Sequence, residues 1–431
     1  MLKKNQIHQI TVTDMNNLGY GIARVEGLVV FVDGGVTEDE LTVKLIKIAK
    51  DYAVARIEAI LIPSPHRIDK DCAAFPRCGG CAFRHVTRDY ELALKRELVV
   101  SAFRKHRMEA EVPPVLTDGR VEGYRNKVQY PVGPNGVIGY YARHSHDIVP
   151  CEACRLTDPA LAPIAAFAAD YIAQSGANVK HLYLRRGQKT GDIMLCFVSP
   201  ASALPNEAAL IEAVRARFPE VKSLLLNIHP EDTNVILGKT VRVLDGEDRI
   251  EDVLCDCRFG ISSLSFYQVN RGAAERLYRE AIARAAARSP SRVADLYCGA
   301  GTIGISLAKA HPGIAVTGVE IVPEAVENAR RNAVLNSIPN ASFRCADAMT
   351  ADLSGYDCVL VDPPRKGLSR ELTDKLCWEK IGHVVYVSCD PTTLARDAAI
   401  LLEAGYRMQT VTPVDMFPRT GAIECVTDFV R

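Results

Sequence analysis

The chain has 431 residues, of which 48% are apolar, so it is long enough to bury a sizeable core, and its length suggests roughly two to four domains. Lys and Arg together number 52, as do Asp and Glu, which excludes binding to nucleic acid through net charge and leaves only a local basic patch. The N-terminal segment lacks the apolar core of a signal peptide and no stretch has the uncharged length of a membrane span, so we expect a cytoplasmic protein without a membrane partner.

Residues 1–62 are expected to form a small β-barrel of the OB type. Short β-branched runs alternate with glycine turns, as in LVVFVDGG, which is typical of closely spaced strands. Two prolines, Pro63 and Pro65, follow these runs and cannot continue a central strand. We therefore place the first domain boundary after residue 62.

Residues 63–255 are expected to form a central α+β domain. Its first part is irregular, with one helix at about 87–107, and its second part combines strands with helices at about 158–175 and 207–217. Over residues 61–144, Lys and Arg outnumber Asp and Glu by 14 to 9, so this is the most basic region of the chain. The candidate phosphate-binding side chains are Arg84, Arg88, Arg104, Lys105, Arg107, Arg125 and Lys127.

Residues 256–431 are expected to form an α/β domain of the Rossmann type. From about residue 270 onward, strand-forming runs such as AVTGVEI and VVYVSC alternate with helical segments such as EAVENARRNAVLN, with Pro or Gly at the joints. Alternating β and α units predict a parallel sheet with helices on both faces. The last two apolar runs have no helix between them and predict a hairpin.

Residues with a potential ligand role follow the predicted strands of this sheet, at the edge where open α/β sheets bind their ligands. DLYCGAGTIG (295–304) supplies glycines for a tight turn, and Glu320 ends the second strand, where ribose hydroxyls are usually bound. Asp347 follows the third strand, and Asp362 begins the loop DPPRKG after the fourth. These motifs look like those of nucleoside methyltransferases that hold S-adenosylmethionine, although taken alone they leave NAD binding open.

The fifth predicted strand ends at Cys389, which places a thiol at the same edge. Most free cysteines are small core residues, but this position favours a nucleophile. Uracil C5 is not nucleophilic enough to take a methyl group unaided, and addition of a thiolate at C6 makes C5 enolate-like. Release of the adduct then needs a base, for which Glu424 in GAIECV is the candidate, although strand alternation also allows Glu424 a solvent-facing position.

Four motifs, FYQVN, DPPRKG, SCDPTTLARD and MFPRTGAIE, closely resemble those of the RNA 5-methyluridine methyltransferase family and occur in the same order. The resemblance implies a class I, S-adenosylmethionine-dependent methyltransferase in which Cys389 is the nucleophile and Glu424 the base. It makes Phe266 a candidate to stack on a nucleic-acid base. It further implies a set of cofactor contacts: Gln268, Tyr297, Glu320, Asp347 and Asp362. The chain departs from the family at Arg419 and Ala422, where histidines are frequent.

A cluster of cysteines in the central region predicts a metal centre. Cys72, Cys78 and Cys81 lie within ten residues, and Cys151 and Cys154 follow further along the chain. The spacing is compatible with a zinc ion or a four-iron cluster, with zinc slightly favoured on spacing alone. The family resemblance instead implies a structural [4Fe-4S] cluster held by Cys72, Cys78, Cys81 and Cys154, with Cys151 outside the ligand set. The other cysteines besides Cys389 are expected in the core: Cys196, Cys255, Cys257, Cys298, Cys345, Cys358, Cys377 and Cys425.

The N-terminal module resembles the TRAM domain, an OB-like RNA-binding barrel, in the run GYGIARVEGLVVFV. Members of the family that carry both this barrel and the cluster usually modify 23S ribosomal RNA, so the resemblance implies a uridine of 23S rRNA as substrate, with a tRNA T-loop uridine as the alternative. A uracil in a folded RNA has to be extruded into the pocket beside Cys389. We expect the protein to be a monomer.

Two other interpretations compete with this one. The first is a non-enzymatic iron–sulfur protein that binds RNA or senses redox state, and the presence of both Cys389 and Glu424 argues against it. The second is an amino-methyltransferase acting on adenine or cytosine, which uses an aromatic residue after its Asn/Asp-Pro-Pro motif. Here Arg365 stands at that position.

Overall fold

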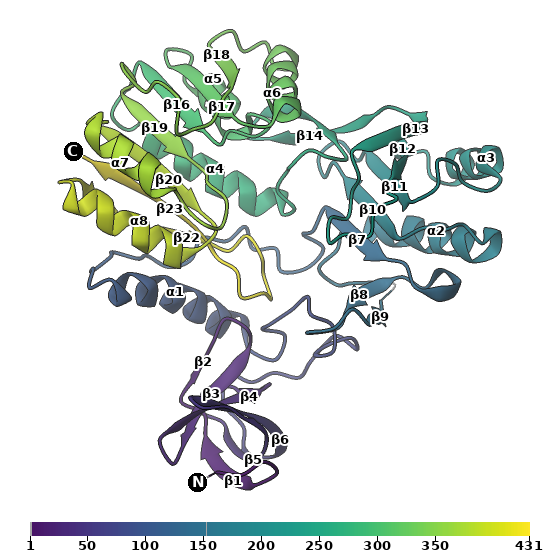
Figure 1. Ribbon diagram of the computed structural model, residues 1–431, viewed down its shortest axis with the longest axis vertical. Coiled ribbons are helices and arrows are strands. Elements are labelled where there is room, and N and C mark those ends of the chain that lie inside the picture. The colour runs from purple at the N-terminus through teal and green to yellow at the C-terminus, as the bar shows by residue number, and fades with distance from the viewer. Residues whose placement is uncertain (1, 152) are drawn as a thin grey trace.

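The computed structural model describes residues 2–151 and 153–431, and its N-terminal strands form a small barrel at one end of the molecule (Figure 1). The strands are β1 (Ile7–Thr11), β2 (Asp14–Met15), β3 (Tyr20–Val25), β4 (Leu28–Asp33), β5 (Glu40–Ile48) and β6 (Tyr52–Ile62). Because β1 pairs with β5 and β2 pairs with β3, the first segment of the chain joins both ends of the sheet and closes it. Alternate side chains of β5, namely Leu41, Val43 and Leu45, fill the core. The predicted OB-like barrel is confirmed.

The central part of the chain contains a five-stranded sheet in the order β13-β12-β11-β10-β7. Its elements and the segments around it are α1 (Arg88–Lys105), β7 (Lys127–Pro131), β8 (Gly139–Tyr141), β9 (Ile148–Pro150), α2 (Ala162–Ser175), β10 (His181–Arg186), β11 (Ile193–Ser199), α3 (Glu207–Arg217), β12 (Val221–Ile228) and β13 (Thr240–Gly246). In β11, Leu195 and Phe197 pack with α2 and α3, whereas Met194 and Cys196 pack toward the C-terminal part. The continuous apolar run of β11 therefore reflects burial on both faces.

The C-terminal part is an eight-stranded sheet in the order β18-β17-β16-β19-β20-β23-β21, with β22 paired to β23. A separate hairpin of β14 (Arg249–Leu254) and β15 (Cys257–Ser262) precedes this sheet. The elements of the sheet and its helices then follow in chain order: α4 (Arg271–Ala286), β16 (Arg292–Leu296), α5 (Thr302–Ala310), β17 (Ala315–Glu320), α6 (Pro323–Leu335), β18 (Ala341–Cys345), β19 (Cys358–Val361), α7 (Arg370–Trp378), β20 (His383–Ser388), α8 (Pro391–Glu403), β21 (Arg407–Met408), β22 (Thr412–Val414) and β23 (Glu424–Val430). The strands β16 to β20 are parallel and β23 is antiparallel, which confirms the alternating pattern and the final hairpin.

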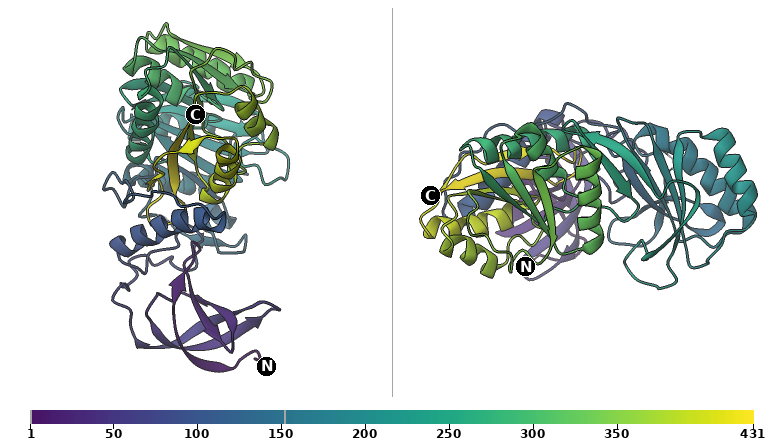
Figure 2. Two further views of the ribbon diagram at one scale, coloured as in Figure 1. Left: turned by 90° about the vertical axis from the view of Figure 1, so that its left-hand side faces the viewer. Right: turned by 90° about the horizontal axis from the view of Figure 1, so that it is seen from above.

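The strand order reverses between β16 and β19, because the chain runs outward from β16 through β17 to β18 and then returns to the other side of β16. Such a switch point opens a crevice at the carboxyl ends of the strands, where ligands bind. Helices α4, α5 and α6 pack on one face of the sheet, and α7 and α8 pack on the other (Figures 1 and 2).

Helix α1 belongs to the central stretch of the sequence but packs against α8 of the C-terminal part. Val99, Ala102 and Phe103 enter the same apolar core as α7 and α8, so α1 lies between the barrel and the C-terminal sheet (Figures 1 and 2). The expected boundary after residue 62 falls at the end of β6, and that after residue 255 falls in the turn between β14 and β15. The domain limits 1–62, 63–255 and 256–431 stay a prediction. Within the described residues, none of the helices has the length and apolar character needed to cross a membrane.

Candidate active site

Cys389 and Glu424 are brought together by the pairing of β20 with β23. In this antiparallel pair Ser388 lies opposite Cys425. Cys389 directly follows Ser388 and Glu424 directly precedes Cys425, so the next pair across the two strands is Cys389 with Glu424. A thiol and a carboxyl that are far apart in the sequence thus meet at the carboxyl end of the parallel strands.

The carboxyl of Glu424 is buried rather than solvent-facing. Only 5% of the residue is exposed, because β23 is covered on both faces and every residue in it is buried. The solvent-facing alternative allowed by strand alternation is therefore wrong. Burial, together with the nearby Asp362, raises the pKa of Glu424 to about 8, while the guanidinium of Arg365 acts in the opposite direction. Its carboxyl forms no hydrogen bond or ion pair within the described part of the chain.

The thiol of Cys389 is partly buried and stands directly before helix α8. Burial and the carboxyl groups of Glu424 and Asp362 raise its pKa to about 11, and Arg365 opposes this effect. Asp390 caps the helix by accepting a hydrogen bond from the Thr392 N–H at 2.8 Å. The thiol therefore belongs to the residue directly before the N-terminal cap of α8.

The loop that carries Asp362 is fastened to helix α8. The hydroxyl of Thr393 donates to the carbonyl of Arg365 at 3.2 Å, and Asp397 accepts the N–H of Leu368 at 2.8 Å. Gly367 has a φ of +73°, a left-handed conformation that favours glycine. Asp362 itself is partly buried, and burial raises its pKa to about 7. Three titratable groups with raised pKa values, Asp362, Cys389 and Glu424, thus gather at one edge of the sheet.

The glycine-rich turn after β16 forms the other half of the crevice. Glu320, at the end of β17, accepts the N–H of Gly299 at 3.1 Å, and a side chain at Gly299 would meet no atom within 4 Å. The turn therefore presents open backbone to a ligand. Tyr297 is partly buried and follows β16, and Asp347 is partly buried and follows β18. Acids at the ends of neighbouring strands beside an open glycine turn are suited to the hydroxyls and amines of a nucleoside.

Asp295, which sequence analysis did not single out, is a further buried acid in this crevice. It is the next-to-last residue of β16 and has 1% of its surface exposed, and burial together with Asp362 raises its pKa to about 8. One carboxyl oxygen accepts the Gly304 N–H at 3.0 Å, and the other has no hydrogen-bond partner among the residues described. The sequence signal for this residue is an acid near the end of the first strand of the sheet, just before the glycine-rich turn.

Gln268 is 8% exposed and lies in a loop that the central part of the chain holds in place. Arg185 donates to the carbonyl of Tyr267 at 3.0 Å, and the side chain of Asn126 donates to the carbonyl of Gln268 at 3.0 Å. Phe266, in the same loop, is 72% exposed, as a side chain available for stacking would be. The central part of the chain therefore helps to set the geometry of the site.

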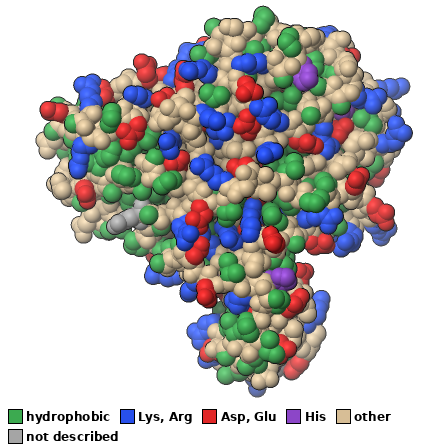
Figure 3. Space-filling view, turned by 180° about the vertical axis from the view of Figure 1, so that it is seen from behind, with side chains coloured by type: hydrophobic (Ala, Val, Ile, Leu, Met, Phe, Trp, Pro, Cys, Tyr) green, Lys and Arg blue, Asp and Glu red, His purple; other side chains and the backbone are tan. Residues whose placement is uncertain are grey.

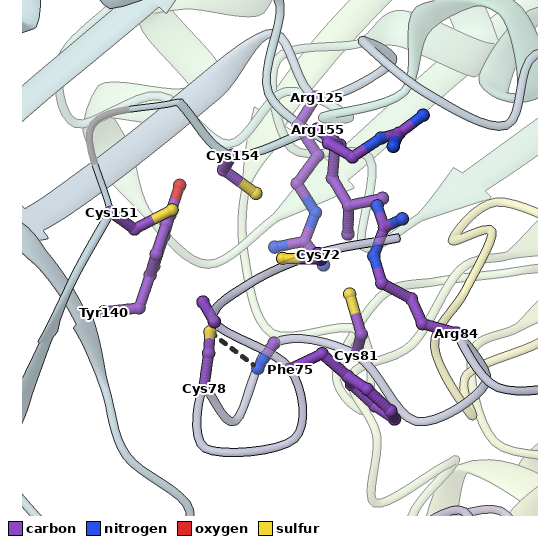
Figure 4. Close-up of a pocket in the computed structure, with 13 residues that line it drawn as sticks. Cys72, Phe75, Cys78, Cys81, Arg84, Arg125, Tyr140, Cys151, Cys154 and Arg155 are labelled. Carbon is purple, nitrogen blue, oxygen red and sulfur yellow. Dashed lines mark hydrogen bonds between the residues drawn. The ribbon is translucent and has the colours of Figure 1, made fainter. Parts of the chain in front are cut away.

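Five cysteines line one cavity of about 40 Å³ (Figure 4). They are Cys72, Cys78, Cys81, Cys151 and Cys154. Cys151, expected to lie outside the ligand set, is on the cavity wall with the other four. Arginines and aromatic rings complete the wall, and the N–H of Gly80 lies 3.4 Å from the Cys78 sulfur. Among the described residues, no three Cys, His, Asp or Glu side chains converge as a site for a metal ion.

Comparison with known proteins identifies the family. A family model described as tRNA (Uracil-5-)-methyltransferase matches residues 249–429, and one for the TRAM domain matches residues 2–57. A Bacillus cereus protein named as an uncharacterized RNA methyltransferase is 38% identical over 446 residues, covering 99% of this chain and 97% of that protein. A Listeria innocua protein of the same description is 38% identical over 447 residues, covering 99% and 98%. This chain belongs to the uracil-5 RNA methyltransferase family.

A solved structure of this uracil-5 methyltransferase family shares the fold over almost the whole chain. The crystal structure of Pyrococcus abyssi tRNA (uracil-54, C5)-methyltransferase in complex with S-adenosyl-L-homocysteine matches with a TM-score of 0.82 and 27% identity, covering 98% of this chain and 100% of that one. The expected class I methyltransferase fold, TRAM domain and family are confirmed. The alternatives of a non-enzymatic iron–sulfur protein and of an amino-methyltransferase are set aside because the family matched is one of uracil-5 RNA methyltransferases.

Several basic side chains expected to bind RNA phosphates in this methyltransferase are engaged inside the protein. Arg84 forms an ion pair with Asp71 at 2.7 Å and its side chain is 1% exposed, and Arg88 pairs with Asp415. Burial lowers the pKa of Lys127 to about 8. The exposed candidates are Arg104, Lys105 and Arg107. On the face seen in Figure 3, basic and acidic side chains are interspersed, so no single basic patch dominates that face.

The cysteines expected in the core mostly lie there, with one clear exception. Cys345 ends β18 and is exposed, although its thiol lies 3.6 Å from the carbonyl of Ile321. A short polar strand at the edge of the sheet explains this position, because β18 has only β17 as a neighbour.

Proposed function

We propose that this chain methylates C5 of a uridine in 23S ribosomal RNA, with Cys389 as the nucleophile, Glu424 as the base and S-adenosylmethionine as the methyl donor. The observation that carries the proposal is the pairing of β20 with β23, because it sets a thiol and a buried carboxyl side by side at the ligand-binding edge of the sheet. Neither group has an evident structural use there. A buried acid without a hydrogen-bond partner is costly and indicates function.

Cys389 and Glu424 act in different steps of the proposed reaction. The Cys389 sulfur, once deprotonated, forms a bond to C6 of the uracil, and the electrons of the C5–C6 double bond move to make C5 enolate-like. S-adenosylmethionine, when bound, supplies the methyl group that C5 takes. The Glu424 carboxylate then accepts the C5 proton, the C5–C6 double bond re-forms, and the bond between sulfur and C6 breaks to return the thiolate.

The raised pKa of Glu424 suits it to this role. A general base works best when its pKa is close to the operating pH, and burial with Asp362 raises that of Glu424 to about 8. As pH rises toward this value, a larger fraction of Glu424 is ionised and able to accept the C5 proton. Near neutral pH, the protonated fraction also reduces the negative charge beside Cys389, which eases formation of the thiolate.

The cofactor is proposed to lie against the carboxyl ends of β16 to β19. Glu320 would hold the ribose hydroxyls, and Asp347 would accept from the adenine amine, while Gln268, Tyr297 and Asp362 would complete the contacts. The open space beside the backbone of Gly299 supports this assignment, since it leaves room for a ligand at the glycine turn. Binding of S-adenosylhomocysteine, measured by calorimetry, tests it.

A [4Fe-4S] cluster is proposed at the cysteine-lined cavity, with Cys72, Cys78, Cys81 and Cys154 as its ligands. Zinc binds four thiolates at about 2.3 Å, which draws their sulfurs to a single point. The five thiols that line this cavity supply the four cysteine ligands that a four-iron cluster needs, which supports the choice. Iron and sulfide analysis of anaerobically purified protein tests this choice, and a zinc-replete, iron-free and active protein would overturn it.

The target RNA has two candidates. The 23S rRNA target rests on the resemblance to relatives that carry both a barrel and a cysteine cluster. The second candidate is a tRNA uridine, because the solved structure described above is that of a tRNA (uracil-54, C5)-methyltransferase. Mapping 5-methyluridine in 23S rRNA and in tRNA, from cells with and without the protein, separates them. A cytoplasmic, monomeric enzyme is part of the same proposal.

The catalytic roles are tested with variants of the two site residues. Cys389→Ala should abolish methylation and prevent a covalent complex with RNA that contains 5-fluorouridine. Glu424→Gln should slow proton removal and accumulate a denaturant-resistant RNA adduct. Cys377→Ala, on α7 and away from the crevice, is the matched control and should behave as the wild type. An active Cys389→Ala variant would refute the thiol mechanism, and full turnover by Glu424→Gln would remove Glu424 from the role of base.

A further inference from the structure

The loop of residues 415–423 leads directly into Glu424, yet helix α1, from a distant part of the sequence, holds it in place. The loop joins β22 to β23 and has little regular structure of its own. Arg419, in its middle, has a φ of +67°, which is an unfavourable conformation for a residue with a side chain. Such a loop keeps one conformation only if its surroundings determine it.

A buried ion network supplies these surroundings. Lys95, Glu91 and Asp415 each have 0% of their surface exposed. The Lys95 ammonium lies 2.6 Å from a carboxyl oxygen of Asp415 and 3.0 Å from one of Glu91, and donates to the carbonyl of Phe417 at 2.9 Å. All three of its N–H donors therefore have a partner, and two of these partners are in the loop.

Further groups hold the next residues of the loop one by one. Glu91 accepts the N–H of Arg419 at 2.6 Å, and the hydroxyl of Tyr124 donates to the carbonyl of Pro418 at 2.9 Å. The N–H groups of Ala82 and Phe83, which directly follow Cys81, donate to the carbonyl of Arg419 at 2.9 and 3.1 Å. Arg88 adds an ion pair to Asp415. The backbone from residue 415 to 419 is thus fixed by side chains and backbone from residues 82–124.

A buried ionic network is an expensive way to stabilise a fold, because desolvation of the charges offsets much of their attraction. Apolar side chains of the same size would pack α1 against the sheet at lower cost. Networks of this kind are useful where one conformation has to be selected, and the conformation selected here is that of the segment before Glu424. The Glu424 carboxyl has no hydrogen bond of its own in the described part of the chain, so its position depends on its backbone, which strand pairing holds on one side and the 415–423 loop holds on the other.

We propose that Lys95, with Glu91 and Asp415, is a positioning residue for methyl transfer and holds the 415–423 loop so that Glu424 can reach the C5 proton. The inference rests on the proposed function, since it assigns the network to the step that Glu424 performs. A positioning role for this network predicts an effect on one reaction step that a purely structural role would not produce. Weakening the network should slow breakdown of the covalent adduct, while formation of the adduct by Cys389 should continue.

The experiment compares the two steps in the full-length protein. Adduct formation is measured with RNA containing 5-fluorouridine, in which the fluorine on C5 blocks the proton removal by Glu424. Adduct breakdown is measured with ordinary uridine RNA in single turnover. Lys95→Met should slow breakdown by about tenfold or more and leave an adduct on uridine RNA, because small displacements of a reacting group cost large factors in rate. Its rate of formation should stay within about twofold of the wild type.

Arg284→Met is the matched control, because it removes a partly buried ion pair from the other end of β23. Arg284 contacts Asp428 at 2.8 Å and the Thr412 hydroxyl at 2.7 Å. It should lower thermal stability without accumulation of adduct on uridine RNA. Equal losses of formation and breakdown in a folded Lys95→Met variant, or normal turnover, would overturn the proposal.

If Lys95→Met does not fold, Tyr124→Phe is used instead, since this substitution removes a single hydroxyl and keeps the ring. A smaller but measurable accumulation of adduct is expected, and an unchanged ratio of formation to breakdown would overturn the proposal. Absence of any adduct between wild-type protein and 5-fluorouridine RNA is a different result. It would refute the proposed thiol mechanism and, with it, the step assigned to the network.

Discussion

Replacement of Glu424 by Gln should make the protein more stable at alkaline pH, although it removes the proposed base. In the folded protein, burial and the nearby Asp362 raise the pKa of Glu424 from 4.5 to about 8. Between these pH values the folded protein holds a proton that the unfolded chain has released, so the free energy of unfolding falls as pH rises. The slope is at most about 1.4 kcal/mol per pH unit, which amounts to a few kcal/mol over the whole window.

Gln resembles the protonated glutamic acid in shape and polarity but does not titrate, so this loss should be absent in the variant. Thermal unfolding of wild-type and Glu424→Gln protein is compared at about pH 5 and about pH 9. We expect similar melting temperatures at the lower pH and a higher one for the variant, by several degrees, at the higher pH. A difference in melting temperature that is the same at both pH values would refute the reasoning.

Asp428→Asn, at the other end of β23, provides a control of opposite sign. Burial acts to raise the pKa of Asp428, but the hydrogen bond from His383 and the charge of Arg284 outweigh it and lower the pKa below 3.8. A lowered carboxyl pKa contributes stability above the unfolded value and loses it as pH falls. Asp428→Asn should therefore be less stable than the wild type at both pH values used.

Three further predictions follow from the crevice. Gly367→Ala should lower the free energy of unfolding by about 1–3 kcal/mol, because the φ of Gly367 is +73° and the new Cβ would lie 2.6 Å from an Asp397 oxygen. Urea titration measures this change, and an unchanged urea midpoint of unfolding would contradict the close contact with Asp397. Glu320→Gln should weaken S-adenosylhomocysteine binding by roughly tenfold in calorimetry, since it removes the charge proposed to hold the ribose, and wild-type affinity would exclude that contact. The rate of adduct breakdown should rise with pH until Glu424 is ionised near its pKa of about 8, and a pH-independent rate would argue against a titrating base.

The amino-acid sequence was sufficient to predict the class of fold and the residues at the ends of the strands. The alternation of strands and helices after residue 270 is a local pattern, and the rules for connecting parallel strands turn it into one sheet topology. Once the strand ends are known, Glu320, Asp362 and Cys389 have to lie at a common edge. The resemblance of four short motifs pointed to the family, which the relatives confirm.

Local patterns failed where a side chain's surroundings come from distant segments. Strand alternation allowed Glu424 to face solvent, but helices cover both faces of β23, so the carboxyl is buried and its pKa is raised. Arg84 is one of several basic residues in a charged region, yet its side chain is internal because Asp71 pairs with it. Period and composition describe neighbours in the chain and carry no information about which remote segment packs against them.

The tertiary structure alone decided which groups meet. Lys95 and Asp415 are 320 positions apart, and their contact exists because α1 crosses from the central part of the chain to pack on α8. Cys151 belongs to the cysteine cavity for a similar reason, since it directly follows β9 and lines the same cavity as Cys72, Cys78 and Cys81, which lie far earlier in the chain. Residue types and strand ends are properties of short stretches of sequence, whereas the pairing of buried charges and thiols follows from long-range packing, which places groups together that no spacing in the chain relates.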